Sequence, residues 1–275
     1  TVRRRCFKKT AGLKPIKTIG NNTVGIKTIV LGKKVDFMKI IFIRHGEPDY
    51  SIDSLTEKGW REAEMVGERL KKVPCDAVFC SPLGRAQDTA SYTLDKMNRS
   101  AQTLPWLCEF EGKILSGLKY ISCWDRLPSE WTKYPEHYDY NEWYNSKIMR
   151  YGNVERKYKT VCNGIDELLK KHGYEHQGNI YKVNNSNHDT IVLFCHFGVE
   201  CVLLSHIMSC SPMVFWHNFV ALPTSVTTLI TEEREKGIAA FRCQQFGDIS
   251  HLYAGGEEPS FAARFCECFD DDTRH

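Results

Sequence analysis

The stretch that decides the fold is Met38-Lys39-Ile40-Ile41-Phe42-Ile43, followed at once by Arg44-His45-Gly46-Glu47. A short apolar run of this kind predicts a strand that is buried on both faces, as in a parallel sheet. The residues that follow it are polar and reactive. Because binding sites in α/β sheets lie at the carboxyl ends of strands, we expect residues 44–47 to line a site.

The same pattern of a strand followed by a helix recurs along the chain. Thr56 is a plausible N-cap for a helix whose apolar residues recur at helical spacing to about residue 70. Ser81 and Pro82 are expected to be the N-cap and first residue of another helix. Further strands are predicted at 76–80, 102–104, 190–195, 225–231 and 238–246, and further helices at 158–171 and 198–208. The chain is therefore expected to be an α/β protein, a three-layer α/β/α fold with a mainly parallel central sheet.

The alternation breaks between about residues 113 and 187, which we interpret as an inserted, mostly helical cap. Residues 119–151 hold nine aromatic side chains in 33 positions, about twice the chain average of 12%. These rings form either the small core of the cap or part of a pocket for an apolar substrate group. The first interpretation is preferred.

The charge of the chain is divided unevenly. Residues 1–37 hold ten Lys or Arg and one acid, whereas the rest hold 27 basic and 33 acidic side chains. We interpret 1–37 as a basic extension, disordered or artefactual, with Met38 as the natural start. A targeting tail or a structured extension are the alternatives. The enzyme-like domain is expected over 38–255 and a C-terminal tail over 256–275.

The acidic charge of the body argues against nucleic-acid binding, and the lack of a long apolar run argues against membrane insertion. We therefore expect a cytoplasmic location. The twelve cysteines include no CxxC pair, so we expect buried free thiols rather than a disulfide framework or a metal centre. The other histidines show no metal-ligand spacing. His172 and His176 are expected in a solvated turn, and we predict no metal and no cofactor.

Three strand ends carry reactive side chains. Arg44 and His45 follow the first strand, Arg85 lies in the first turn of the helix after the second, and His196 follows the strand at 190–195. Arginine offers paired donors that match phosphate oxygens, and a helix N-terminus adds positive potential. A neutral His45 can attack phosphorus, and the nearby arginines help to keep it neutral. The pattern favours phosphoryl transfer through a phosphohistidine.

These motifs resemble those of the histidine phosphatase superfamily, and most closely its phosphoglycerate mutase-like branch. The resemblance rests on three segments, Arg44-His45-Gly46-Glu47, Ser81-Pro82-Leu83-Gly84-Arg85 and Cys195-His196-Phe197-Gly198. It covers about residues 38–112 and 190–250. It implies that His45 is the nucleophile and that Arg44, Arg85 and His196 bind the phosphate group.

The resemblance also implies a carboxylic acid that protonates the leaving alcohol, within a Leu-x-Glu segment after the third strand. Leu107-Cys108-Glu109 matches that segment, so Glu109 is assigned, with Glu111 as the competitor. The third motif reads His196-Phe197-Gly198 where the family often has His-Gly-Gly. This change is expected to leave His196 in place and to narrow the pocket.

The sequence thus favours a metal-independent phosphomonoester hydrolase that acts on a small phosphorylated metabolite. The first motif lacks the asparagine usual in the mutases, and the insertion differs from theirs, so a mutase or a sugar bisphosphatase is the alternative. An inactive homologue that binds a phosphorylated ligand is the alternative of another class. A homo-oligomer is possible on this sequence.

Overall fold

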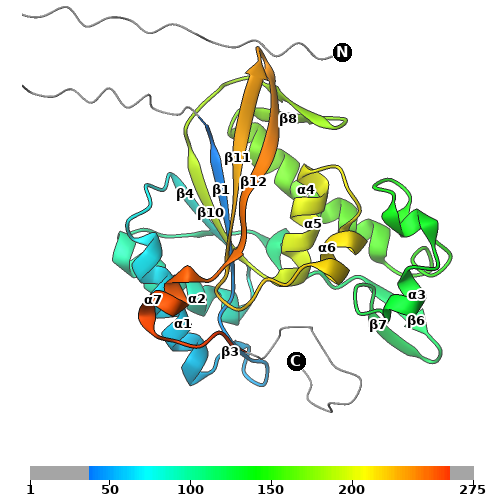
Figure 1. Cartoon of the computed structure of the whole chain (residues 1–275), viewed down its shortest axis with the longest axis horizontal. Helices are drawn as coiled ribbons and strands as arrows, with labels where there is room; N and C mark the ends of the chain where they lie inside the picture. The colour runs from blue at the N-terminus through cyan, green and yellow to red at the C-terminus, as the bar shows by residue number, and fades with distance from the viewer. Residues whose placement is uncertain (1–36, 261–275) are drawn as a thin grey trace, which may run out of the picture. The chain divides into compact units, whose positions relative to one another are not determined.

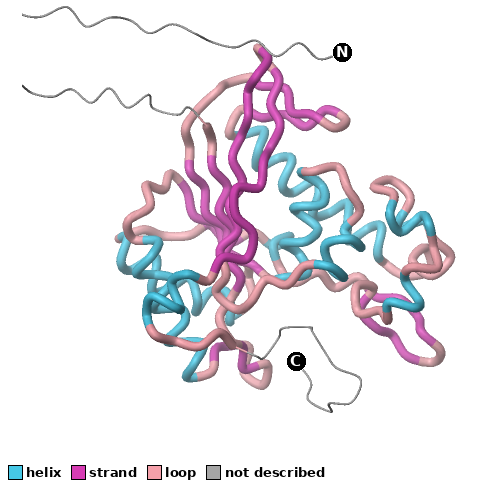
Figure 2. The backbone as a smooth tube through the Cα atoms, in the orientation of Figure 1, coloured by secondary structure: helices cyan, strands magenta, loops and turns pink. Residues whose placement is uncertain are grey.

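A mixed sheet of eight strands organises residues 37–260, the part of the chain that the computed structural model describes (Figures 1 and 2). The strands lie in the order β5-β4-β10-β1-β11-β12-β9-β8. Their bounds are β1 Lys39–Arg44, β4 Ala77–Cys80, β5 Gln102–Thr103, β8 Tyr174–Gln177, β9 Ile180–Val183, β10 Thr190–Cys195, β11 Val226–Glu235 and β12 Ile238–Asp248. The first four strands in that order pair in parallel, and the pairings beyond β1 are antiparallel.

Helices cover both faces of the sheet, which confirms the predicted three-layer α/β/α fold (Figure 1). The helices are α1 Glu57–Leu70, α2 Gly84–Met97, α3 Pro128–Trp131, α4 Val154–Lys171, α5 Phe197–Ile207, α6 Pro212–Asn218 and α7 Ser250–Gly255, with 3₁₀ turns η1 Pro105–Leu107, η2 Pro135–Tyr138 and η3 Trp143–Asn145. Apolar residues of α1 and α2 form one core, and those of α4, α5 and α6 form the other.

The β1 strand shows why its residues are apolar without alternation. Ile40 and Phe42 belong to the core beneath α5, whereas Ile41 and Ile43 belong to the core beneath α1 and α2. Successive side chains of a strand point to opposite faces, so a strand between two helical layers must be apolar on both. β10, its parallel neighbour, is likewise buried at every position.

Of the two helix starts predicted from N-cap residues, that of α1 is confirmed and that of α2 is wrong. Thr56 caps α1, as predicted, by accepting the backbone N–H of Gly59 at 3.1 Å. The prediction that Ser81 and Pro82 open the next helix is wrong, because α2 begins at Gly84. The Ser81 hydroxyl instead contacts a histidine of the candidate site.

The predicted insertion is not a single unit. Its first part holds a hairpin of β6 Lys113–Ser116 and β7 Lys119–Ser122, then α3 and the short turns. Its last part belongs to the central sheet, since β9 pairs with β12 and β8 pairs with β9. The sequence pattern did not predict these short edge strands because β9 has only four residues, of which Tyr181 alone is buried.

The aromatic side chains of the insertion pack mainly against one another. Trp143 is fully buried, with its ring edge-on to those of Tyr158 in α4 and Trp216 in α6. Trp131 stacks on His217 with ring centroids 4.5 Å apart. This packing supports the preferred interpretation, in which the rings form a core between the insertion and the helices.

The ends of the chain are described in part. Residues 1–36 and 261–275 lie outside the described residues, and so do the predictions made for them. Residues 256–260 contact the body, because Glu257 pairs with Arg61 and Ser260 donates to Glu47. Within residues 37–260, no helix has both the length and the apolarity that crossing a bilayer requires. The nine cysteines of that range are all free.

Candidate active site

The carboxyl ends of three neighbouring parallel strands meet at one edge of the sheet. Arg44, the last residue of β1, is in register with Cys195, the last residue of β10. Phe194 in turn pairs with Cys80 at the end of β4. The residues that follow these strands therefore emerge side by side, which brings the predicted motifs together.

His45 is held in one orientation by its own loop. Its backbone N–H donates to the carbonyl oxygen of Cys195 at 3.0 Å, and its ring Nδ1 lies 2.7 Å from the carbonyl oxygen of Gly46. A carbonyl only accepts, so Nδ1 carries the proton and Nε2 carries the lone pair. Burial and then Arg44 hold the pKa of His45 well below its ordinary value. The ring is therefore neutral and nucleophilic near neutral pH.

His196 lies beside His45, with ring centroids 5.0 Å apart. Its Nε2 is 2.7 Å from the Ser81 hydroxyl, which itself accepts the backbone N–H of Leu83. Among the described residues, His196 Nδ1 has no hydrogen-bond partner. When Ser81 donates to Nε2, Nδ1 carries the proton and is available to an anion.

Two arginines supply the positive charge at this edge. Arg44 is buried, donates to the carbonyl oxygen of Ala221 and lies over the ring of Phe197 at 5.6 Å. Phe197 is itself buried as the first residue of α5. The Phe197 ring therefore packs against the Arg44 guanidinium. The sequence predicted only that Phe197 narrows the pocket and did not predict this contact.

Arg85 lies in the first turn of α2, as predicted. It pairs with Asp53, whose other oxygen accepts the backbone N–H of Gly84 at 2.7 Å. The Tyr50 ring lies 5.4 Å from the Arg85 guanidinium. Asp53 thus fixes both the start of α2 and the direction of the Arg85 side chain.

A hydroxyl ties the first motif to the second. The backbone N–H of Gly46 donates to Thr89 Oγ1 at 2.9 Å, and that hydroxyl donates to the carbonyl oxygen of Arg85 at 2.7 Å. Gly46 has no room for a side chain, since a Cβ there would stand 2.7 Å from the carbonyl oxygen of Gly59. The loop after β1 therefore packs tightly on the start of α1.

Glu109 reaches the same edge from the segment after η1. Its Oε1 accepts the backbone N–H groups of Phe110 at 2.7 Å and Val199 at 3.1 Å. Burial raises the pKa of Glu109, opposed by the bond to Phe110 and by Arg44. Glu111 is exposed. Of the two carboxyl groups that the sequence left open, the structure brings only Glu109 to the histidines and arginines.

Sequence reasoning missed three residues of the site. It took Ser81 for a helix cap, and it gave no role to Asp53 or Thr89, which orient Arg85 and the Gly46 loop. The only signal for Ser81 was its place at the end of a predicted strand. Asp53 adopts a left-handed backbone conformation, with φ of 49°, inside a loop that offers no pattern.

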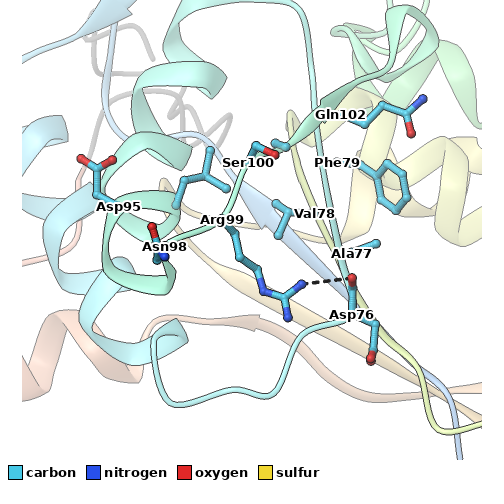
Figure 3. Close-up of a pocket in the computed structure, with 11 residues that line it drawn as sticks. Asp76, Ala77, Val78, Phe79, Asp95, Asn98, Arg99, Ser100 and Gln102 are labelled. Carbon is cyan, nitrogen blue, oxygen red and sulfur yellow. Dashed lines mark hydrogen bonds between the residues drawn. The ribbon is translucent and has the colours of Figure 1, made fainter.

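A large hollow lies elsewhere on the molecule. Its volume is about 840 Å³, and it is lined by residues such as Asp76, Arg99 and Gln102 (Figure 3). Asp76 directly precedes β4, so the hollow lies at the amino end of that strand, away from His45. Arg99 donates to the carbonyl oxygen of Asp76 at 3.1 Å across it. Because sites of α/β sheets lie at the opposite ends of the strands, we do not assign the reaction there.

Two histidines and two arginines lie at the carboxyl edge of the central sheet, an arrangement that can hold an anion next to a neutral imidazole. The model of the histidine phosphatase superfamily (branch 1) matches residues 40–244, and the chain belongs to this superfamily.

Curated relatives include both mutases and phosphatases. A 2,3-bisphosphoglycerate-dependent phosphoglycerate mutase of Thermoplasma acidophilum is 39% identical over 77 residues, which are 24% of this chain and 38% of the mutase. A probable phosphatase of Schizosaccharomyces pombe is 24% identical over 231 residues, which are 78% of this chain and 95% of that protein. The match to the mutase therefore spans less than half of the mutase's length.

Solved structures share the fold. A phosphoserine phosphatase mutant of Entamoeba histolytica covers 78% of this chain and 99% of its own, with a TM-score of 0.53 and 19% identity. A mycobacterial glucosyl-3-phosphoglycerate phosphatase covers 78% of this chain and 100% of its own, with a TM-score of 0.54 and 16% identity. At these identities the comparison establishes the fold alone.

Proposed function

We propose that the protein is a metal-independent phosphomonoester hydrolase that works through a phosphohistidine at His45 on a small phosphorylated metabolite. The observation that carries the proposal is the state of the His45 ring. Its Nδ1 is bonded to the carbonyl oxygen of Gly46, and burial beside Arg44 keeps the ring neutral. The Nε2 lone pair is then available to attack phosphorus.

The arginines supply the complementary charge, and His196 adds a hydrogen-bond donor. Arg44 and Arg85 offer guanidinium donors to the phosphoryl oxygens, and His196 Nδ1 offers a further N–H. These groups are fixed by packing and by hydrogen bonds before substrate arrives, so little reorganisation is needed as charge develops. Phosphate charge is stabilised here by residues of the chain itself.

The two chemical steps balance through Glu109. In the first, His45 Nε2 bonds to phosphorus, the ester P–O bond breaks, and protonated Glu109 gives its proton to the leaving alkoxide. In the second, water attacks phosphorus, the bond from phosphorus to His45 Nε2 breaks, and the water proton passes to the Glu109 carboxylate as phosphate leaves. The raised pKa of Glu109 supports its role as the acid of the first step.

Two observations favour a hydrolase over a mutase. The relatives named as phosphatases align over most of this chain, whereas the Thermoplasma mutase aligns over 24% of it. The insertion, which is unlike that of the mutases, also reaches the site, because Trp124 Nε1 donates to the carbonyl oxygen of Phe110, the residue after Glu109, at 3.1 Å. A mutase or sugar bisphosphatase remains the alternative enzyme. The intact set of two histidines, two arginines and one carboxyl disfavours an inactive homologue.

The test is hydrolysis of para-nitrophenyl phosphate in excess EDTA by the wild type, by His45→Ala and by the control His188→Ala, which changes an exposed histidine. We expect the wild type and the control to be active and His45→Ala to lose at least about 10³-fold in kcat. Loss of wild-type activity with EDTA would contradict the metal-free mechanism. Full activity of His45→Ala would contradict the nucleophile.

Trapping the intermediate identifies its chemistry. Wild-type protein quenched during turnover should hold a phosphoryl group that is labile in acid and stable in base, as a phosphohistidine is. Interconversion of 2- and 3-phosphoglycerate faster than hydrolysis would instead establish the mutase.

A further inference from the structure

A cluster of three possible metal ligands lies away from the candidate active site. It consists of Asp166 from α4, His176 from β8 and His206 from α5. One donor atom from each of these side chains lies within 4.8 Å of the other two. Among the described residues, this is the only such group of three histidine, cysteine, aspartate or glutamate side chains.

Two of the distances between donor atoms of the cluster are near those between the ligands of one metal ion. His206 Nε2 lies 2.9 Å from Asp166 Oδ1, but His176 Nδ1 lies 3.5 Å from Asp166 Oδ2, at the limit of a hydrogen bond. Ligands that bind zinc at about 2.1 Å in a tetrahedron are about 3.4 Å from one another. His176 Nε2 has no hydrogen-bond partner among the described residues, so the polar contact of this ring is the approach of its Nδ1 to Asp166.

The surroundings orient one ligand as metal sites usually do. His206 Nδ1 is 2.8 Å from the Tyr140 hydroxyl, so Nδ1 can donate its proton there while Nε2 faces Asp166. A metal-bound histidine usually makes a hydrogen bond of this kind through its other ring nitrogen. His206 is buried, which limits its freedom to turn away.

We propose that Asp166, His176 and His206 bind a zinc ion. Two imidazoles and one carboxylate favour zinc over magnesium or calcium, which prefer oxygen ligands. Three ligands from the protein leave the fourth tetrahedral position to water.

The ion would join the insertion to the core. Asp166 and His176 belong to the segment 154–183, whereas His206 lies near the end of α5, the helix that begins directly after His196. The ten-residue step from His196 to His206 corresponds to about 15 Å of helix. The zinc ion would therefore stabilise the docking of α4 and β8 on α5 without touching the reacting phosphate.

This proposal departs from the sequence prediction that no metal is bound. His176 was paired with His172 by their spacing, but the structure separates the two side chains. His172 lies in the turn after α4, as predicted, with its Nδ1 2.7 Å from Asp189, whereas His176 lies in β8. The three proposed ligands come from three elements, so no spacing within the sequence could reveal them.

The test measures zinc directly. Protein stripped with EDTA is titrated with ZnCl₂ by calorimetry, and its Tm is recorded with and without zinc. The variants are Asp166→Asn and His206→Gln, and His172→Ala is the control, since it removes a histidine with a single carboxylate partner. We expect one zinc ion per chain in the wild type and control, and a rise in Tm of about 5–10 °C at zinc a hundred times the Kd.

Both ligand variants should lose this binding. If His206→Gln fails to fold, Asp166→Asn, which keeps the size of the side chain, still decides the matter. Absence of stoichiometric zinc in the wild type, or equal binding by Asp166→Asn, overturns the proposal. Hydrolysis of para-nitrophenyl phosphate in EDTA, well below the Tm, tests the proposed function separately, because the zinc ion has no part in that chemistry.

Discussion

The imidazole rings of His45 and His196 lie 5.0 Å apart and are tilted by 55° to each other, at the ends of the neighbouring parallel strands β1 and β10. Each ring has one nitrogen bonded by its surroundings, to the Gly46 carbonyl oxygen for His45 and to the Ser81 hydroxyl for His196. The other nitrogens, Nε2 of His45 and Nδ1 of His196, are those that the proposed mechanism uses to attack phosphorus and to bind a phosphoryl oxygen, so changes at Ser81 should affect the site through His196.

Glu109→Gln should separate substrates by their leaving groups. An alkyl phosphate needs a proton for its alkoxide, so its kcat should fall by about 10²–10⁴-fold, whereas para-nitrophenyl phosphate should lose much less. The control is Glu111→Gln, which changes an exposed neighbour. Equal losses on both substrates would mean that Glu109 does not act as the acid.

Gly198→Ala should displace the carboxyl group of Glu109 and so impair its role as the acid. The new Cβ would stand 2.5 Å from Glu109 Oε1, so that carboxyl must move. We expect a drop in kcat of about 10²-fold with little change in circular dichroism. In a double-mutant cycle, Gly198→Ala should cost far less in the Glu109→Gln background. Strict additivity would show that the two residues act independently.

Ser81→Ala should weaken phosphate binding through His196. The variant removes the hydroxyl 2.7 Å from Nε2, a bond worth about 1 kcal/mol, which corresponds to about fivefold in affinity. The inhibition constant of inorganic phosphate should rise by this factor, and Ser81→Thr should restore it. An unchanged inhibition constant in Ser81→Ala would place His196 outside the phosphate pocket.

Glu62→Gln should change how stability depends on pH. Glu62 is fully buried behind the first motif, its Oε2 accepts the Glu47 N–H at 2.9 Å, and burial raises its pKa to about 7. From about pH 4.5 to 7 the unfolded chain loses this proton while the folded chain keeps it, so the free energy of unfolding falls as pH rises.

The size of this effect is about 3 kcal/mol over the interval, at 1.36 kcal/mol per pKa unit. Urea unfolding at several pH values should show the full loss in the wild type and in Glu64→Gln, an exposed position of the same helix, and a smaller loss in Glu62→Gln, where buried Glu200 with its pKa raised to about 7 still contributes. Parallel pH curves for all three proteins would mean that Glu62 ionises alike in both states.

The three-layer fold and the candidate residues at the strand ends could be predicted because both depend on local sequence. The unbroken apolar runs of β1 and β10 require helices on both faces of the sheet, and reactive residues directly follow three strands. The partners of those residues could not be predicted in this way. Asp53 meets Arg85, and Thr89 meets Gly46, through contacts across loops whose conformation no periodicity encodes.

The sequence by itself determined the layers and the order of the motifs, and it identified four candidate site residues, His45, Arg44, Arg85 and His196. It could do so because a buried strand and its end can be recognised from a run of consecutive residues. Only the tertiary structure decided that Ser81 serves His196 rather than a helix, that Glu109 and not Glu111 reaches the site, and that Asp166, His176 and His206 meet. These facts depend on distances between elements far apart in the chain, which are set by how the helices pack on the sheet.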